Sequence, residues 1–172
     1  VRVPKRNLVG EQNMGFYVAA ALLDFERSGV EYSAVGRRTL EDLVDYARKT
    51  RRNGRALSDD QRVRQRLADM AIEINASQLL SYRTAWLQSS GQPFNKEASM
   101  AKLYGSQMLQ RLFQMATEVL GLDCQVWDGP NPPRRGRIIS EYLEAFSHTI
   151  RRGTSEVQRN IIAQRGLGLP RE

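Results

Sequence analysis

The chain has 172 residues, of which 41% are hydrophobic and 26% are charged, and these values are typical of one soluble globular domain rather than a disordered segment. A single cysteine, Cys124, and a single histidine, His148, exclude an internal disulfide and argue against a Cys/His metal site. No apolar run approaches the roughly 20 residues of a membrane-spanning helix. We therefore expect a cytoplasmic protein without a membrane anchor or a bound metal.

The net charge of +7 and the pI near 10.0 make nucleic acids, phosphate-bearing ligands and acidic partners worth considering. The cations are spread over most of the predicted helices and seldom alternate with aromatic residues, unlike those of a platform that stacks nucleic-acid bases. This distribution favours an arginine-rich solvated surface over a nucleic-acid site.

Three regions are predicted along the chain: an extended linker over 1–12, a helical bundle over 13–166 and a short tail over 167–172. The linker contains Pro4 and Gly10, which disfavour a helix. From residue 14 the apolar residues recur at helical spacing, which predicts one long helix with a possible bend at Ser28-Gly29 and a stop at Asn53-Gly54.

The second predicted helix starts at a capping box formed by Ser58 and Gln61, and it ends at the break over 90–93. The third starts at Asn95, which we expect to act as its N-cap, and runs to about Leu120. Its apolar residues occupy more than one face, so this helix should be buried against several neighbours.

The segment 129–133 is rich in proline and should form a loop, while helices are predicted over about 138–147 and 154–164. No segment after residue 12 alternates at the period of two that is typical of strands. The fold class is therefore predicted to be all-α, an up-and-down four-helix bundle with an extra short helix.

Several short stretches occur together in an order and spacing more specific than any one of them, namely Val3-Pro4, 7–11, Gly15-Phe16, 24–27, 98–102 and 153–163. Together they resemble the C-terminal third of the acyl-CoA dehydrogenases. The resemblance implies a longer enzyme with an N-terminal helical domain, a middle β-domain and this bundle, usually assembled as a tetramer. It also implies α,β-dehydrogenation of an acyl-CoA, FAD as the hydride acceptor and an electron-transfer flavoprotein as the electron acceptor.

The resemblance also points to a catalytic base. Many family members carry a glutamate directly before the Gly-Thr of the last motif, but this chain has Arg152, which cannot accept a proton. Others carry the base in a Glu-Arg pair on the first long helix, which Glu26-Arg27 matches. We therefore expect Glu26 to be the base, although the helical pattern alone fits a solvated or ion-paired residue. A non-catalytic subunit that serves assembly and cofactor clamping is the alternative.

The resemblance places substrate contacts at Asp24, Phe25 and Arg27. Asp24 and Arg27 lie one helical turn apart, so an ion pair between them is the alternative to a substrate contact.

The family's FAD contacts correspond to Arg51, Gln61, Thr154 and Glu156, for which solvated surface and helix capping are the alternatives. A glycine-rich segment of the family keeps only Gly121 here. Related flavin oxidases and monooxygenases share this architecture, so the resemblance specifies the fold more closely than the reaction.

Overall fold

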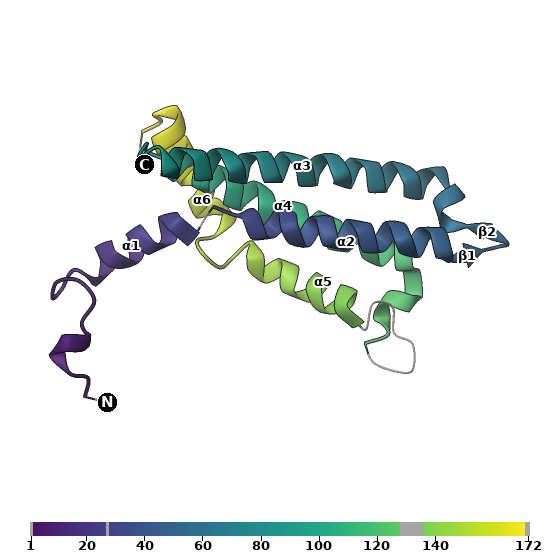
Figure 1. The fold of residues 1–172 in the computed structure, drawn as a ribbon, viewed down its shortest axis with the longest axis horizontal. Coiled ribbons are helices and arrows are strands. Elements are labelled where there is room, and N and C mark those ends of the chain that lie inside the picture. Colours follow the sequence, from purple (N-terminus) through teal and green to yellow (C-terminus); the bar gives the residue numbers. More distant parts are fainter. Residues whose placement is uncertain (1, 27, 128–135, 171–172) are drawn as a thin grey trace.

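The computed structural model describes residues 2–26, 28–127 and 136–170, without the side chains of Asp24 and Phe25. Within these ranges most residues are helical (Figure 1). The elements, in chain order, are the 3₁₀ turn η1 (Lys5–Asn7), α1 (Gly15–Glu26), α2 (Val30–Lys49), β1 (Arg51–Arg52), β2 (Arg55–Ala56), the 3₁₀ turn η2 (Leu57–Asp59), α3 (Gln61–Ser89), α4 (Asn95–Leu120), the 3₁₀ turn η3 (Gly121–Gln125), α5 (Arg137–His148), α6 (Ser155–Ile161) and the π-helical turn η5 (Ile162–Gly166).

The helices α2, α3 and α4 run up and down beside one another, and α5 and α6 lie against α4 (Figure 1). Because it contacts neighbours on several sides, α4 contributes the largest set of buried residues, as its apolar pattern predicted. The core combines α4 with residues of α2, α3 and α5, including Leu43, Ile74, Leu112, Phe113 and Ile138. The predicted all-α helical bundle is confirmed.

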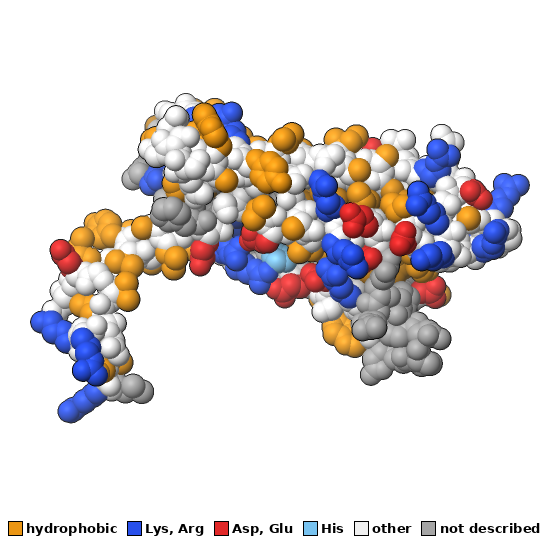
Figure 2. Space-filling view, viewed as in Figure 1, with side chains coloured by type: hydrophobic (Ala, Val, Ile, Leu, Met, Phe, Trp, Pro, Cys, Tyr) orange, Lys and Arg blue, Asp and Glu red, His pale blue; other side chains and the backbone are white. Residues whose placement is uncertain are grey.

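The first predicted helix is wrong in one respect, because the chain forms two helices, α1 and α2, and not one bent helix. Gly29 separates them with a φ of +74°, a left-handed conformation that a helix cannot continue through. A Cβ at this position would also lie 3.3 Å from the Tyr32 Cδ2 atom, which is a tight contact. The helix before this break, α1, projects away from the bundle, and its residues Phe16, Tyr17 and Leu22 are exposed (Figures 1 and 2).

The Asn53-Gly54 pair does not end α2; it forms the turn of a short β-hairpin. Both residues have positive φ, +53° and +79°, as a two-residue hairpin turn requires. The flanking residues pair as Arg51 with Ala56 and Arg52 with Arg55. The helix itself ends earlier, at Lys49. Asn-Gly is a hairpin signal, and the strands here are too short for an alternating pattern to reveal them.

Two predicted helix caps are also wrong. The N-cap of α3 is Asp60, whose side chain accepts a hydrogen bond from the Arg62 N–H at 2.8 Å, while Ser58 lies in η2. Asn95 is the first residue of α4, not its cap. In contrast, the cap of the last helix is confirmed, because the Thr154 hydroxyl accepts from the Val157 N–H at 3.3 Å.

A tyrosine and a glycine fit together where α2 crosses α4. Tyr32 is 1% exposed, and a Cβ added at Gly105 would lie 2.6 Å from its Cδ2 atom. The missing side chain at position 105 therefore lets the ring lie against the α4 backbone. This contact anchors the start of α2, where the candidate site lies.

The remaining expectations concern the chain outside the bundle. The segment predicted to be extended contains the short turn η1, and the residues around it are exposed. The proline-rich loop predicted over 129–133 falls outside the described residues. Among the helices that the structure describes, none is long and apolar enough to cross a membrane.

Candidate active site

Three charged side chains from three parts of the sequence meet beside the α1–α2 break. Glu26 ends α1, Glu31 lies in the first turn of α2, and Arg152 lies in the turn between α5 and α6. The Arg152 Nε atom is 3.9 Å from Glu26 Oε2, and its Nη1 atom donates a hydrogen bond to Glu31 Oε1. The guanidinium thus lies between two carboxylates, and all three side chains remain partly open to solvent.

Buried polar side chains donate hydrogen bonds to the backbone carbonyls of the turn that carries Arg152. Arg152 itself has a φ of +59°, which is uncommon for a residue with a Cβ. The Gly153 carbonyl accepts hydrogen bonds from Lys102 Nζ at 2.7 Å and Gln158 Nε2 at 3.3 Å, and the same Gln158 nitrogen lies 3.2 Å from the Arg152 carbonyl oxygen. Lys102 and Gln158 are both fully buried. Their bonds satisfy the turn's carbonyls and fix its backbone.

Burial and neighbouring charges perturb the groups around this turn. Burial raises the pKa of Tyr32, an effect that the Arg152 guanidinium opposes. Burial and the adjacent Arg151 lower the pKa of His148, whose ring lies edge-on to that of Tyr32 at 5.6 Å between centroids. Burial, the largest single influence, lowers the pKa of Arg152, but the hydrogen bond to Glu31 and the charges of Glu31, Tyr32 and Glu26 together raise it, so the net direction is upward.

The residues expected to contact substrate are only partly described. Asp24 and Phe25 belong to the last turn of α1, just before Glu26, but their side chains are outside the described set. Arg27 lies outside the described residues altogether.

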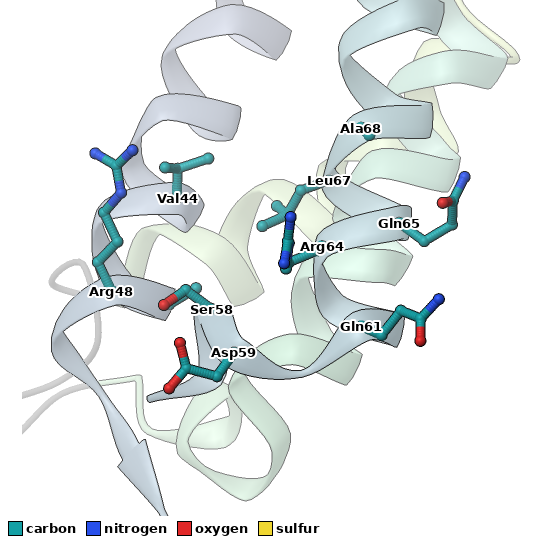
Figure 3. A pocket seen from close by; sticks show the side chains of 10 residues that line it. Val44, Arg48, Ser58, Asp59, Gln61, Arg64, Gln65, Leu67 and Ala68 are labelled. Atoms are coloured by element: carbon teal, nitrogen blue, oxygen red, sulfur yellow. The ribbon is translucent and has the colours of Figure 1, made fainter. Parts of the chain in front are cut away.

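Two of the expected cofactor residues, Arg51 and Gln61, lie at the hairpin end of the bundle. Arg51 is exposed on β1 and its Nη1 lies 3.4 Å from the Gly54 carbonyl oxygen. Gln61 opens α3 and lines a hollow of about 780 Å³ between α2, η2 and α3, together with Arg48 and Arg64 (Figure 3). Cationic side chains gather at this end (Figure 2), and Arg48, Arg51 and Arg64 are among the exposed residues there. Exposed guanidinium groups of this kind suit a phosphate ligand.

The other two, Thr154 and Glu156, lie at the opposite end of the bundle, where α6 begins (Figure 1). A hydrogen bond from its own backbone N–H, and then the Thr154 hydroxyl, lower the pKa of Glu156. Both side chains thus take part in capping α6, a helix of only seven residues. The four expected cofactor residues therefore form two separate groups and do not converge within one chain.

Residues 13–167 match the family described as acyl-CoA dehydrogenase, C-terminal domain. That match covers most of the chain, and it agrees with relatives that are similar over nearly its whole length. The chain belongs to the acyl-CoA dehydrogenase family. It is 36% identical to the short-chain specific acyl-CoA dehydrogenase of Rattus norvegicus, over 94% of this chain and 38% of that protein. It is 33% identical to CarC, a subunit of the caffeyl-CoA reductase-Etf complex of Acetobacterium woodii, over 95% of this chain and 42% of that protein.

Solved structures agree with this placement. The butyryl-CoA dehydrogenase of Megasphaera elsdenii superimposes with a TM-score of 0.81 and 29% identity, over 96% of this chain and 42% of that chain. The chain thus spans about two-fifths of the length of the curated relatives it matches, and it corresponds to the helical C-terminal domain of an acyl-CoA dehydrogenase.

Two residues of this acyl-CoA dehydrogenase domain were not singled out from the sequence. Glu31, which binds Arg152, falls in the first turn of α2, where an acidic residue is ordinary. Lys102 belongs to a stretch that carried the resemblance, but no role was assigned to it. The available signal was its spacing, because it follows Ala98 by four residues on the buried face of α4.

Proposed function

We propose that this chain is the C-terminal domain of an FAD-dependent acyl-CoA dehydrogenase in which Glu26 is the catalytic base. One observation carries the proposal. The carboxylate at the less common base position of the family, Glu26, lies 3.9 Å from the side chain at the commoner position, Arg152. A base at either position would therefore reach the same place, and moving it from residue 152 to residue 26 requires no other change of geometry.

In the proposed reaction the Glu26 carboxylate accepts the α-proton of an acyl-CoA thioester. When bound, FAD supplies the acceptor for the β-hydrogen, which leaves as a hydride. A carboxylate acts as a base toward carbon when it lies within contact distance of the α-proton and when water is excluded. Glu26 keeps 42% of its side-chain surface exposed, so the substrate itself can cover it.

The residues expected to hold FAD fit its chemistry, with Arg51 as a cation for the pyrophosphate and Gln61, Thr154 and Glu156 as hydrogen-bonding groups for its hydroxyls and amides. The two groups are separated by roughly the length of α2, which at about 1.5 Å per residue is on the order of 30 Å. We infer that one flavin contacts Arg51 and Gln61 of one copy and Thr154 and Glu156 of another. This arrangement makes a dimer or tetramer a requirement of the cofactor site.

The proposed partners follow from the same reading: an acyl-CoA substrate, further copies of the protein and an electron-transfer flavoprotein, all in the cytoplasm. The relative CarC, whose name places it in a complex with Etf, supports the last of these partners. Fatty-acid metabolism is the proposed setting.

A second function is favoured by the same ion pair. Arg152 forms an ion pair with the candidate base Glu26, an arrangement that also suits a subunit that serves assembly and cofactor clamping. This non-catalytic subunit would bind FAD without oxidising an acyl-CoA, as would a related flavin oxidase or monooxygenase with a different substrate.

The deciding experiment compares the full-length protein with its Glu26→Gln variant. The variant keeps the shape of the side chain, so flavin content should stay near the parental value while the rate of flavin bleaching by acyl-CoA falls by roughly 10²–10⁴-fold. Glu41→Gln, an exposed change on α2, is the matched control and should leave the rate unaltered. A parental rate in the Glu26 variant would reject Glu26 as the base. A parental protein that binds FAD but is bleached by no acyl-CoA would support the non-catalytic subunit.

A further inference from the structure

We propose that Glu31 is a positioning residue for Glu26, acting through Arg152. Glu31 holds the Arg152 guanidinium on the first turn of α2 and so prevents it from closing onto the Glu26 carboxylate. The inference rests on the proposed function of Glu26 as the base, and it adds to that function a residue with a defined role.

The unequal sharing of Arg152 is the first observation. The Nη1 atom hydrogen-bonds to Glu31, whereas the Nε atom lies 3.9 Å from Glu26, beyond hydrogen-bonding distance. A guanidinium can bind one carboxylate through two parallel hydrogen bonds, and that is its preferred geometry. With Glu26 the described contact stops short of this geometry, while Glu31 receives the hydrogen bond.

The second observation is that the backbone beneath Arg152 is fixed. Lys102 and Gln158 bind the carbonyls of the turn from a fully buried position, so the turn has little freedom to shift. The guanidinium can therefore change partners mainly by rotating its side chain. Among the described side chains, Glu26 is the other carboxylate within 4.0 Å of the guanidinium, so it is the partner we expect Arg152 to turn to if the Glu31 carboxylate is removed.

The consequence concerns the lone pairs of the base. A carboxylate that accepts two hydrogen bonds from a guanidinium must break them before it can take a proton from carbon, and this adds to the barrier. A carboxylate held at 3.9 Å keeps its oxygens available and still remains ordered by the nearby cation. Glu31 therefore allows the Arg152 cation to keep the Glu26 carboxylate ordered without hydrogen-bonding to the oxygens that must accept the proton.

The test uses the full-length protein and four variants: Glu31→Gln, Arg152→Gln, the double variant Glu31→Gln/Arg152→Gln, and Glu41→Gln as the control on the same helix. A panel of acyl-CoA thioesters that includes butyryl-CoA is used as the probe, at saturating concentration. Glu31→Gln should slow flavin bleaching about tenfold, which corresponds to roughly 1.4 kcal/mol. The double variant should recover to within about threefold of Arg152→Gln alone, because the group that closes onto Glu26 is gone. Glu41→Gln should keep the parental rate.

If Arg152→Gln restores the bleaching rate of the Glu31→Gln protein, Glu31 acts by positioning Arg152. If Glu31 had only a structural role, the two substitutions would slow bleaching additively. A readout without turnover is the crystal structure of the Glu31→Gln protein, in which Arg152 nitrogen atoms should move to hydrogen-bonding distance from Glu26. Should Glu31→Gln fail to fold, Glu31→Asp replaces it, because it keeps the charge on a shorter side chain and should slow bleaching by less than tenfold.

The outcomes separate the two proposals. If Glu26→Gln abolishes bleaching while Glu31→Gln leaves both the rate and the Arg152 conformation unaltered, the role of Glu31 is wrong and the base stands. The same holds if the double variant is as slow as or slower than Glu31→Gln. If Glu26→Gln bleaches at the parental rate, the base is wrong, and the role of Glu31 is rejected with it.

Discussion

Glu26 and Arg152 lie at opposite ends of the sequence, yet the Oε2 atom of the first is 3.9 Å from the Nε atom of the second. We propose that each occupies one of the two positions at which the family carries its catalytic glutamate. The ion pair therefore joins the proposed base, Glu26, to the residue at the other proposed base position, Arg152.

This relationship predicts that the base can be moved back. In the full-length protein, Glu26→Gln/Arg152→Glu should bleach at least about tenfold faster than Glu26→Gln alone, because a carboxylate again reaches the same place. Arg152→Glu alone should lower the melting temperature, since it adds a third carboxylate beside Glu26 and Glu31 and removes the described ion pairs of Arg152 to them. Stopped-flow reduction and thermal denaturation measure the two effects. No gain in the double variant would show that the two positions do not serve one substrate.

The cofactor groups predict separable losses of FAD affinity in the full-length protein. Arg51→Ala should weaken FAD binding by roughly 1.5–3 kcal/mol, because it removes a charge-assisted contact, and Thr154→Ala by less. Arg38→Ala, at an exposed residue of α2 whose described ion pair is to Asp42, is the control. Isothermal titration of the apoprotein with FAD measures each value. Unchanged affinity in both variants would exclude these residues from the cofactor site.

The exposed apolar side chains predict that this 172-residue chain associates when it is produced alone. Most apolar residues of α4 are buried within the chain, so we expect association through exposed apolar residues of other helices, such as Leu79 and Trp86 on α3 and Leu143 on α5. Because its two cofactor groups lie at opposite ends, the chain alone should bind FAD weakly or not at all. Light scattering and flavin absorbance of the purified chain test both points. A strict monomer at high concentration, or stoichiometric flavin, would contradict the corresponding expectation.

The environment of His148 predicts a loss of stability in mild acid. Burial, followed by the Arg151 cation, lowers its folded-state pKa below the unfolded value near 6.5. Above pH 6.5 His148 is mostly neutral in the folded and in the unfolded protein, so its titration does not change the free energy of unfolding. As the pH falls below this value, the unfolded state binds a proton before the folded state does, so stability decreases until the folded pKa is passed. The melting temperature of the parent should fall more between pH 7.5 and pH 5.5 than that of the His148→Gln variant. Equal slopes in the two proteins would show that other groups account for the acid sensitivity.

The contact between Tyr32 and Gly105 predicts a cost for the smallest possible side chain. Gly105→Ala places a Cβ 2.6 Å from the ring and should destabilise the protein by about 1–3 kcal/mol, less the roughly 0.5–1 kcal/mol gained from helix propensity. Gly15→Ala, where a Cβ would meet nothing within 4 Å, is the matched control. Urea denaturation measures both. A stabilised Gly105→Ala protein would mean that the ring moves aside freely.

Helical spacing was sufficient to predict α3, α4 and α5 to within a few residues, because their apolar positions repeat over many turns. It was not sufficient at Gly29, because periodicity continues across a single residue whose φ changes sign. It also missed the hairpin around Asn53-Gly54, since two-residue strands carry no pattern.

For the candidate site, the sequence pointed to Glu26 and Arg152 only through the resemblance to a family. Their contact depends on the α1–α2 break and on the turn that Lys102 and Gln158 hold, and both are properties of tertiary packing. The role proposed for Glu31 could not be predicted from its position either, because an acidic residue in the first turn of a helix has an ordinary electrostatic explanation.

The fit of Tyr32 against Gly105 also constrains how this domain can diverge. Any side chain at position 105 would occupy the volume of the ring, and a smaller residue at position 32 would leave a hole against the α4 backbone. A change at either position alone should therefore destabilise the packing of α2 on α4. A larger residue at position 105 combined with a smaller one at position 32 would keep the total side-chain volume of the contact nearly constant. Lineages of this domain should therefore carry the two residues as a covarying pair, and a break in that pairing would mark a shift of α2 against α4.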